Sequence, residues 1–535
     1  MIYKSPKLFR KLSSILFLVF VFYFEVDGQS HSYKQKIATK ILDRLFEVSA
    51  YPEIQKPKLV ILGSKTLAAN YVPSSNTIFI EDALYLICRS FGKDSLNALA
   101  FIIAHELTHA IFKDINLGLV PTSYLNYAGS FISNEREEQV ADLQGSFLAT
   151  ISGYPSQQVL AGLIEKIYDI YHIEDKPKDA YPPKHIRIES AQSVLSQLEN
   201  LLIVFENANW LVAKAEYELA QTLYDYILQY YRGLEIYNNR GIALVSQAMQ
   251  YYNEETDIFV HPLELDLNSR LKKFNKTRGD LPPEDFQKRM LLLNKAKACF
   301  ETAHKLSAEY APAMIHLVSC YNLMNQPENA IKYFESNRLA IKSKKWNVSN
   351  SFQLKQAIGI SYALQNNARA KTYFAKTFPE LSSDLHSNAK YNLNLFQLKT
   401  KNDKLKQSLL QPFVCNWNSE TTTGKLNLFN ENHPVSKSIE ISSGTNSLEL
   451  VYKTDAERRI YLIRNKELPL LSIVRKIADS NTILEFQKMQ RELDPVCQTQ
   501  QQSSIGMFYS FEASNIVYIL NKHGKITEQI QFLYN

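Results

Sequence analysis

The sequence predicts a mainly α-helical protein with three successive parts after a short leader, and three patterns support this. Residues 29–200 mix helical patterning with two short β-rich runs. Residues 201–405 are rich in helical patterning, and residues 406–535 alternate apolar and polar side chains as strands do. Because 535 residues are too many for one core, we expect an α+β domain, an α-solenoid and a small β-rich C-terminal domain.

Residues 1–28 have the layout of a signal peptide. Four basic side chains precede an unbroken apolar run from Ile15 to Phe24, and Val26-Asp-Gly28 offers small residues for cleavage. This run would cover only about half of a hydrocarbon core, so an uncleaved spanning helix is the weaker alternative. No cysteine follows the run at a position suited to lipid attachment. We therefore expect a periplasmic or secreted chain with no stable membrane span after signal cleavage.

The composition is that of a folded soluble protein, with 45% hydrophobic and 21% charged residues. The formal net charge of +6 is spread along the chain, so nucleic acid is not an expected partner. Five cysteines at scattered positions do not form a disulfide framework, and buried free thiols are expected. A bridge between Cys415 and Cys497 remains an alternative.

The N-terminal part is expected to combine a small sheet with helices. Lys58–Leu62 and Thr77–Ile80 are short β-rich runs separated by the turn-prone Pro73-Ser-Ser-Asn76, as in paired strands. Helical spacing of apolar residues predicts four helices, at residues 32–47, 82–88, 95–112 and 134–151. The Gly- and Pro-containing stretch at 116–133 connects the last two helices and is a candidate gate.

A metal-binding pattern lies in the third of these helices. His105 and His109 are four residues apart and project from one helix face, so both imidazoles can reach one metal ion, while Glu106 is rotated by about 100° toward a water at the metal. The flanking residues are apolar, and charged groups buried there need a partner. A catalytic zinc usually has three protein ligands, so a third ligand must come from elsewhere.

Glu138 is the expected third ligand, on the following helix. Asp142 lies four residues later on the same face, where it can accept the N–H of a zinc-bound histidine and fix its tautomer. Glu135 and Glu137 are competing ligands in the same acidic cluster, but neither has an aspartate four residues on. We therefore expect one Zn²⁺ per chain, held by His105, His109 and Glu138.

This ligand set predicts metal-assisted hydrolysis of peptide bonds, with Glu106 as general base and then general acid. A purely structural zinc is less favoured, because structural sites usually have four protein ligands and often cysteines, and no cysteine lies near the motif. A binding protein, adaptor or chaperone with a silent or regulatory zinc domain remains the alternative.

The residues His105-Glu-x-x-His109 and Glu138-x-x-Ala-Asp142 resemble the HtpX- and BepA-like gluzincins, peptidase family M-forty-eight, over about residues 32–200. The resemblance implies an α+β gluzincin metallopeptidase domain whose edge strand pairs with the substrate backbone. That edge would be Thr77, Ile78, Phe79 and Ile80. Exported members that carry helical repeats degrade misassembled proteins in bacterial envelopes, which implies unfolded or misassembled protein substrates and a role in protein quality control.

Residues Ala180–Arg187 resemble a further family element, in which a His-Pro pair precedes an arginine by six residues. In this chain Tyr181 stands in place of that histidine. The resemblance implies that Tyr181, or His185 in the same loop, donates a hydrogen bond to a developing oxyanion. The alternative is that Tyr181 only packs and His185 lies in solvent. Arg187 is expected to hold this segment in place through an ion pair.

The helical part resembles tetratricopeptide repeats, in which small and large residues alternate across two antiparallel helices. The clearest unit comprises Leu317, Val318, Tyr321, Ala330 and Phe334. Looser units comprise Tyr237, Gly241 and Leu244, then Ala296, Phe300, Ala303 and Pro312, and finally Gly359, Tyr362, Ala370 and Phe374. The periods are irregular, so a non-repeating helical bundle stays open. We expect these helices to recruit clients or an envelope partner complex.

The last part alternates apolar and polar residues in the runs 438–441, 448–452, 516–520 and 526–532, with a hairpin turn at His523-Gly524. These runs predict a β-rich domain. It contains no chemical motif, and its role is open.

Overall fold

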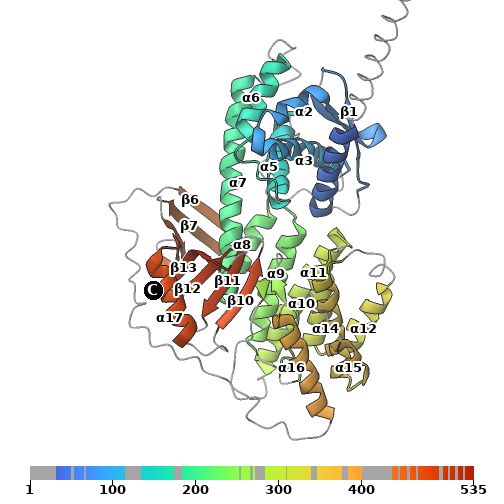
Figure 1. The fold of residues 1–535 in the computed structure, drawn as a ribbon, viewed down its shortest axis with the longest axis vertical. Coiled ribbons are helices and arrows are strands. Elements are labelled where there is room, and N and C mark those ends of the chain that lie inside the picture. The colour runs from blue at the N-terminus through green and yellow to red at the C-terminus, as the bar shows by residue number, and fades with distance from the viewer. Residues whose placement is uncertain are drawn as a thin grey trace, which may run out of the picture. The chain divides into compact units, whose positions relative to one another are not determined.

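The computed structural model describes residues 32–534 with gaps (Figure 1). The gaps are 50–53, 66–67, 115–133, 174–182, 252, 254, 266–268, 271–282, 309, 339–345, 376–382, 401–436, 444–445, 455–457, 466–467, 493–497, 504–505, 512–515 and 522–523. The chain is mainly helical with an antiparallel sheet near its C-terminus, as the sequence predicts. It forms two compact units, Met1–Leu201 and Leu202–Asn535. The expected signal peptide and the candidate gate lie outside the described residues.

The first unit contains a three-stranded sheet in the order β1-β3-β2. Strand β3 (Thr77–Glu81) pairs in parallel with β1 (Lys58–Leu62) and antiparallel with β2 (Ala69–Val72). The expectation that Thr77, Ile78, Phe79 and Ile80 form the sheet edge is therefore wrong, because β3 is hydrogen-bonded on both sides. The apolar run of β3 correctly predicted a strand. Residues 69–72 have no clear alternation of apolar and polar side chains, so the sequence did not predict that β2 pairs with the other side of β3.

The helices of the first unit pack against this sheet or against one another. They are a helix at residues 32–49, α2 (Asp82–Arg89), α3 (Ser95–Asp114), α5 (Asn134–Ile151), α6 (Leu160–Ile170) and the start of α7 (Lys184–Ala213). The four helices predicted from apolar spacing end within two residues of the observed helices. Helix α3 packs against α5, α2 and β2. It is buried along most of its length, including Ala100, Ile103, Leu107 and Ala110.

The second unit contains a series of helices that pack one on the next. They are α8 (Tyr217–Leu228), α9 (Leu234–Met249), α10 (Pro283–Leu306), α11 (Ala311–Leu323), α12 (Pro327–Ser336), α14 (Val348–Leu364), α15 (Arg369–Phe374) and α16 (Ser383–Thr400). A glycine and an aromatic ring meet in two of these pairs. A Cβ at Gly241 would lie 2.5 Å from the ring of Phe300, and one at Gly359 would lie 2.7 Å from the ring of Phe374.

The same turn ends three of the helices. Ala215, Asn325 and Asn366 each have a positive φ, of 66°, 56° and 54°. The next residue in each turn donates its N–H to the carbonyl five residues earlier, with N···O distances of 2.8–2.9 Å. This pattern is a Schellman cap, in which a left-handed residue reverses the chain after a helix. The local geometry therefore recurs along the helical part, although its spacing is irregular.

The C-terminal sheet has eight antiparallel strands in the order β10-β11-β12-β13-β9-β8-β7-β6. They are β6 (Lys437–Ser443), β7 (Asn446–Thr454), β8 (Arg458–Asn465), β9 (Leu468–Ile477), β10 (Gln498–Ser503), β11 (Gly506–Phe511), β12 (Ile516–Leu520) and β13 (Ile526–Tyr534). All four predicted strand runs lie within them. Helix α17 (Ser480–Glu492) packs Phe486 and Met489 against Tyr509 and Tyr518 of the sheet.

Two further expectations concern cysteines and membrane spans. Cys88, Cys299 and Cys320 are buried free thiols, as predicted, while Cys415 and Cys497 lie outside the described residues. In the part of the chain that the structure describes, no helix has both the length and the apolar character needed to cross a bilayer.

A two-stranded ribbon of β4 (Glu264–Leu265) and β5 (Ser269–Arg270) completes the described strands.

Candidate metal centre

Helix α3 places the ionisable side chains of His105, Glu106 and His109 inside the first unit. Ala104 and Leu107, which flank the pair His105 and Glu106, are fully buried, and the pair itself is only 9% and 8% exposed. Burying charged or polar groups without a partner is unfavourable, so these side chains need hydrogen bonds, opposite charges or a cation. The neighbouring helix α5 supplies the partners (Figure 1).

His105, His109 and Glu138 point their donor atoms at one another. The two Nε2 atoms of the histidines are 3.1 Å apart. The Glu138 carboxylate spans them, with Oε2 3.4 Å from Nε2 of His105 and Oε1 3.3 Å from Nε2 of His109. The imidazoles come from one face of α3, as the four-residue spacing predicts, and the carboxylate comes from the facing helix. This His-His-Glu group could hold a metal ion.

A second set of contacts holds His105 and Glu138 in place. The Nδ1 atom of His105 lies 2.8 Å from Oδ1 of Asp142, which is fully buried. Arg187 at the start of α7 donates to both oxygens of Asp142 and, through Nη2, to Oε2 of Glu138 at 3.2 Å. Because a carboxylate accepts the Nδ1–H, Nε2 is the His105 atom that faces Glu138 and His109, so its lone pair would be directed at a metal ion once Nε2 loses its proton.

The charges of this group favour a cation. Burial lowers the pKa of His105, but the hydrogen bonds that its ring donates to Asp142 and Glu138 outweigh this effect and raise the pKa to about 10. Burial raises the pKa of Glu138, but its contacts with His105, His109 and Arg187 hold that pKa well below the usual range. The carboxylates of Asp142 and Glu138 thus keep His105 protonated in the metal-free chain. A divalent cation that binds here would replace the proton on Nε2.

Glu106 lies beside the group rather than in it. Burial raises its pKa, and the nearby His105 and His109 partly offset this. Its carboxylate accepts a hydrogen bond from the backbone N–H of Tyr71 in β2. The carbonyl of Ala68 accepts a hydrogen bond from the N–H of Glu81 in β3, at 2.8 Å. Along an antiparallel strand the backbone groups of successive residues alternately face the partner strand and face away from it. The N–H of Tyr71, three residues after Ala68, therefore points away from β3. The edge strand next to the site is therefore β2.

Gly145 also belongs to the site, although it has no functional group that would have identified it in the sequence. It lies three residues after Asp142 on the same face of α5. A Cβ at Gly145 would be 2.9 Å from the backbone nitrogen of His105 and 3.0 Å from its Cα. Only glycine allows α3 and α5 to approach so closely at the first histidine. A mid-helix glycine on the ligand face is the sequence signal that could have identified it.

The structure does not bring every expected residue to the site. His185 is exposed on the first turn of α7, and no contact within the described part of the chain joins it to the His-His-Glu group. Tyr181 lies outside the described residues, as do the side chains of Glu135 and Glu137. Arg187 makes ion pairs rather than facing solvent, and its partners are Asp142 and Glu138.

No protein-family model matches the sequence, and no curated protein matches it either. What the chain does therefore has to be inferred from its own residues and their geometry.

Proposed function

We propose that this chain is an exported zinc metalloendopeptidase that hydrolyses peptide bonds of unfolded or misassembled proteins. The observation that carries the proposal is the convergence of His105, His109 and Glu138 beside the buried carboxylate of Glu106. Three protein ligands and an adjacent base make up a typical hydrolytic zinc site, whereas a structural zinc usually has four protein ligands.

The geometry of the ligand group fits zinc. Zinc bonds to nitrogen and oxygen are roughly 2.0–2.2 Å long, so neighbouring ligand atoms in a tetrahedral site lie about 3.3–3.6 Å apart. The Nε2 atoms of His105 and His109 are 3.1 Å apart, and each lies near its own oxygen of Glu138, His105 at 3.4 Å from Oε2 and His109 at 3.3 Å from Oε1. Two imidazoles and one carboxylate suit zinc better than Ca²⁺ or Mg²⁺, which prefer oxygen ligands.

Each nearby side chain has a role in the proposed reaction. Zinc bound here would supply a Lewis acid that lowers the pKa of a water from about 16 toward 7. Glu106 takes a proton from the attacking water on its carboxylate and delivers it to the leaving amine, and its raised pKa suits both steps. Asp142 fixes the tautomer of His105, and Arg187 orients Asp142 and Glu138.

The predicted leader and the sheet support the proposed substrate class. A signal peptide would direct the enzyme to the periplasm or outside the cell, where misassembled envelope proteins are the expected clients. An extended client segment would align along β2, the edge strand whose Tyr71 contacts Glu106. The helical part, with tetratricopeptide-like pairs, would recruit the client or an envelope partner complex.

Casein degradation by the purified protein tests the proposal. We expect degradation that stops when a chelator removes the metal and resumes when zinc is added. Glu106→Gln should keep zinc bound while lowering the rate at least about a hundredfold, since a general base contributes that much or more. Glu328→Gln, on the exposed surface of the second unit, is the matched control and should degrade casein normally. Zinc binding without any chelator-sensitive cleavage would instead favour an adaptor.

A further inference from the structure

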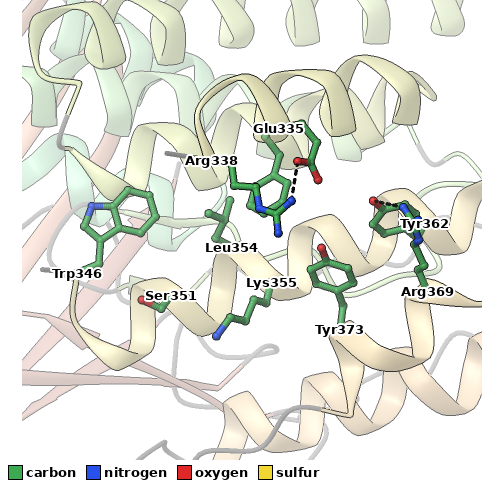
Figure 2. Close-up of a pocket in the computed structure, with 10 residues that line it drawn as sticks. Glu335, Arg338, Trp346, Ser351, Leu354, Lys355, Tyr362, Arg369 and Tyr373 are labelled. Carbon is green, nitrogen blue, oxygen red and sulfur yellow. Dashed lines mark hydrogen bonds and ion pairs between the residues drawn. The ribbon is translucent and has the colours of Figure 1, made fainter. Parts of the chain in front are cut away.

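A cavity of about 550 Å³ lies among the helices of the second unit (Figure 2). Its walls come from α12 and the residues just after it, from Trp346 and α14, and from α15. This volume is in the range of ligand-binding pockets. None of its residues belongs to the candidate metal centre.

The cavity carries an excess of positive charge. Arg338, Lys355 and Arg369 line it together with a single acidic residue, Glu335. Arg338 and Glu335 form an ion pair of 3.4 Å on the exposed surface, with 56% and 44% of the two side chains accessible. Exposed ion pairs of this kind are weak. Arg338 can therefore exchange Glu335 for a carboxylate of a bound ligand.

The same cavity has aromatic walls. Tyr362 and Tyr373 are stacked, with ring centroids 5.4 Å apart and an interplanar angle of 27°. The Arg369 guanidinium lies 5.7 Å from the centre of the Tyr362 ring and donates a long hydrogen bond of 3.5 Å to its hydroxyl, drawn as a dashed line in Figure 2. Flat rings beside cations suit a ligand that has an apolar side chain next to an acidic group.

Trp346 adds a further aromatic ring to the wall of the cavity. A flat apolar ring beside cationic side chains extends the surface available to the apolar side chain of such a ligand.

We propose that this cavity binds an acidic peptide segment in which a carboxylate is adjacent to an aromatic or large aliphatic side chain. The basic residues bind the carboxylate, and the stacked tyrosines and the ring of Trp346 contact the apolar side chain. The inference rests on the proposed function in one respect only, because the segment would then belong to a client of the peptidase. Recognition in the cavity does not require hydrolysis.

Fluorescence anisotropy with the full chain carrying Glu106→Gln tests this without cleavage of the probe. The probe is a fluorescein-labelled peptide with a Phe-Asp-Glu-Phe core between Gly-Ser flanks. We expect saturable binding that weakens as salt is added, because exposed charges are screened. A Phe-Asn-Gln-Phe analogue and an Ala-Asp-Glu-Ala analogue should each bind about tenfold more weakly. Free and amidated C-termini distinguish terminal from side-chain carboxylates, and equal binding of both assigns the side chains.

Variants locate the site. Arg338→Gln together with Arg369→Gln should weaken binding about tenfold, and Trp346→Ala, which removes the ring from the wall, should weaken it about threefold. Lys371→Gln is the matched control, because Lys371 is an exposed cation of α15 that does not line the cavity. Absence of binding, equal binding of the neutral analogue, or an equal effect of Lys371→Gln overturns the proposal.

The two proposals fail separately. A wild-type chain that binds the acidic peptide but never degrades casein refutes the peptidase and leaves the cavity assignment intact. A chain that degrades casein while its Glu106→Gln form does not bind the peptide refutes the cavity assignment alone.

Discussion

Gly145 of α5 touches the backbone of His105 of α3, since a Cβ at Gly145 would lie only 2.9 Å from the His105 nitrogen. This contact sets the distance between the helix that carries the two imidazoles and the helix that carries Glu138. The metal centre depends on it because the Glu138 carboxylate reaches the two imidazoles only when α3 and α5 are this close.

Gly145→Ala should push the two helices apart. Overpacking of this kind costs about 1–3 kcal/mol, against about 1 kcal/mol that alanine gains in helix propensity. We expect a lower free energy of unfolding and a zinc affinity reduced by at least about tenfold. Urea unfolding and competition with a zinc chelator measure both.

Gly162→Ala in α6 is the control, because its Cβ would meet Phe91 at an ordinary 3.7 Å. It should leave zinc affinity unchanged and stability equal or higher. A Gly145→Ala protein with normal zinc affinity would show that the helix spacing does not set the site.

Asp142→Asn should weaken zinc binding about 10- to 100-fold, the usual effect of removing the partner of a metal-bound histidine. The substitution removes the negative charge that holds Nδ1–H on His105 and replaces one of the two oxygens that accept from Arg187 by an NH2 group. Asp169→Asn serves as the control, since Asp169 pairs with Lys184 at the surface. Equal zinc affinities of the two variants would exclude the orienting role of Asp142.

Arg187→Gln should destabilise the chain by about 3 kcal/mol, the lower end of the usual cost of breaking a buried ion pair, because Asp142 keeps His105 as a second partner. Asp142 is fully buried and takes two hydrogen bonds from this guanidinium. Arg187→Lys keeps the charge but not the paired donors, so it should recover part of the loss. Chemical unfolding of the metal-free proteins measures this, and an unchanged midpoint for Arg187→Gln would contradict it.

Zinc binding should release a proton from His105. The pKa of this group is raised from 6.5 to about 10 in the metal-free chain, so it is charged at neutral pH and must lose its proton to bind the metal. Apparent zinc affinity should therefore rise about tenfold for each pH unit between roughly pH 7 and 9. Calorimetry in buffers of different ionisation enthalpy counts the protons. A pH-independent affinity over this range contradicts the shift.

The same raised pKa affects folding of the metal-free chain. A group whose pKa is higher in the folded state contributes stability fully below its unfolded value, and this contribution is lost as the pH rises through the folded value. The His105 contribution should thus be complete below pH 6.5 and lost toward pH 10.

Local patterns predicted the helices and the ligand pair. The spacing of His105 and His109 is a property of one helix, and apolar periodicity gives the bounds of such a helix to within a turn. The partnership of Glu138 with Asp142 is also local, because both lie on one face of α5.

Long-range contacts were harder to predict. Which strand lies at the edge depends on pairing order, so β2 and its Tyr71 were missed and β3 was wrongly placed there. Gly145 was missed because its importance comes from a helix 40 residues away in sequence, to which no local pattern points. The cavity beside Trp346 likewise needs three helices brought together.

Zinc content of Glu138→Gln, compared with Glu137→Gln, tests the central claim most directly. Both carboxylates lie in the same acidic stretch of α5, so the pair separates a specific ligand from general negative charge. Elemental analysis after dialysis against zinc-free buffer should give one zinc per chain for the wild type and for Glu137→Gln, and almost none for Glu138→Gln. A full equivalent of zinc in Glu138→Gln would contradict the proposed centre.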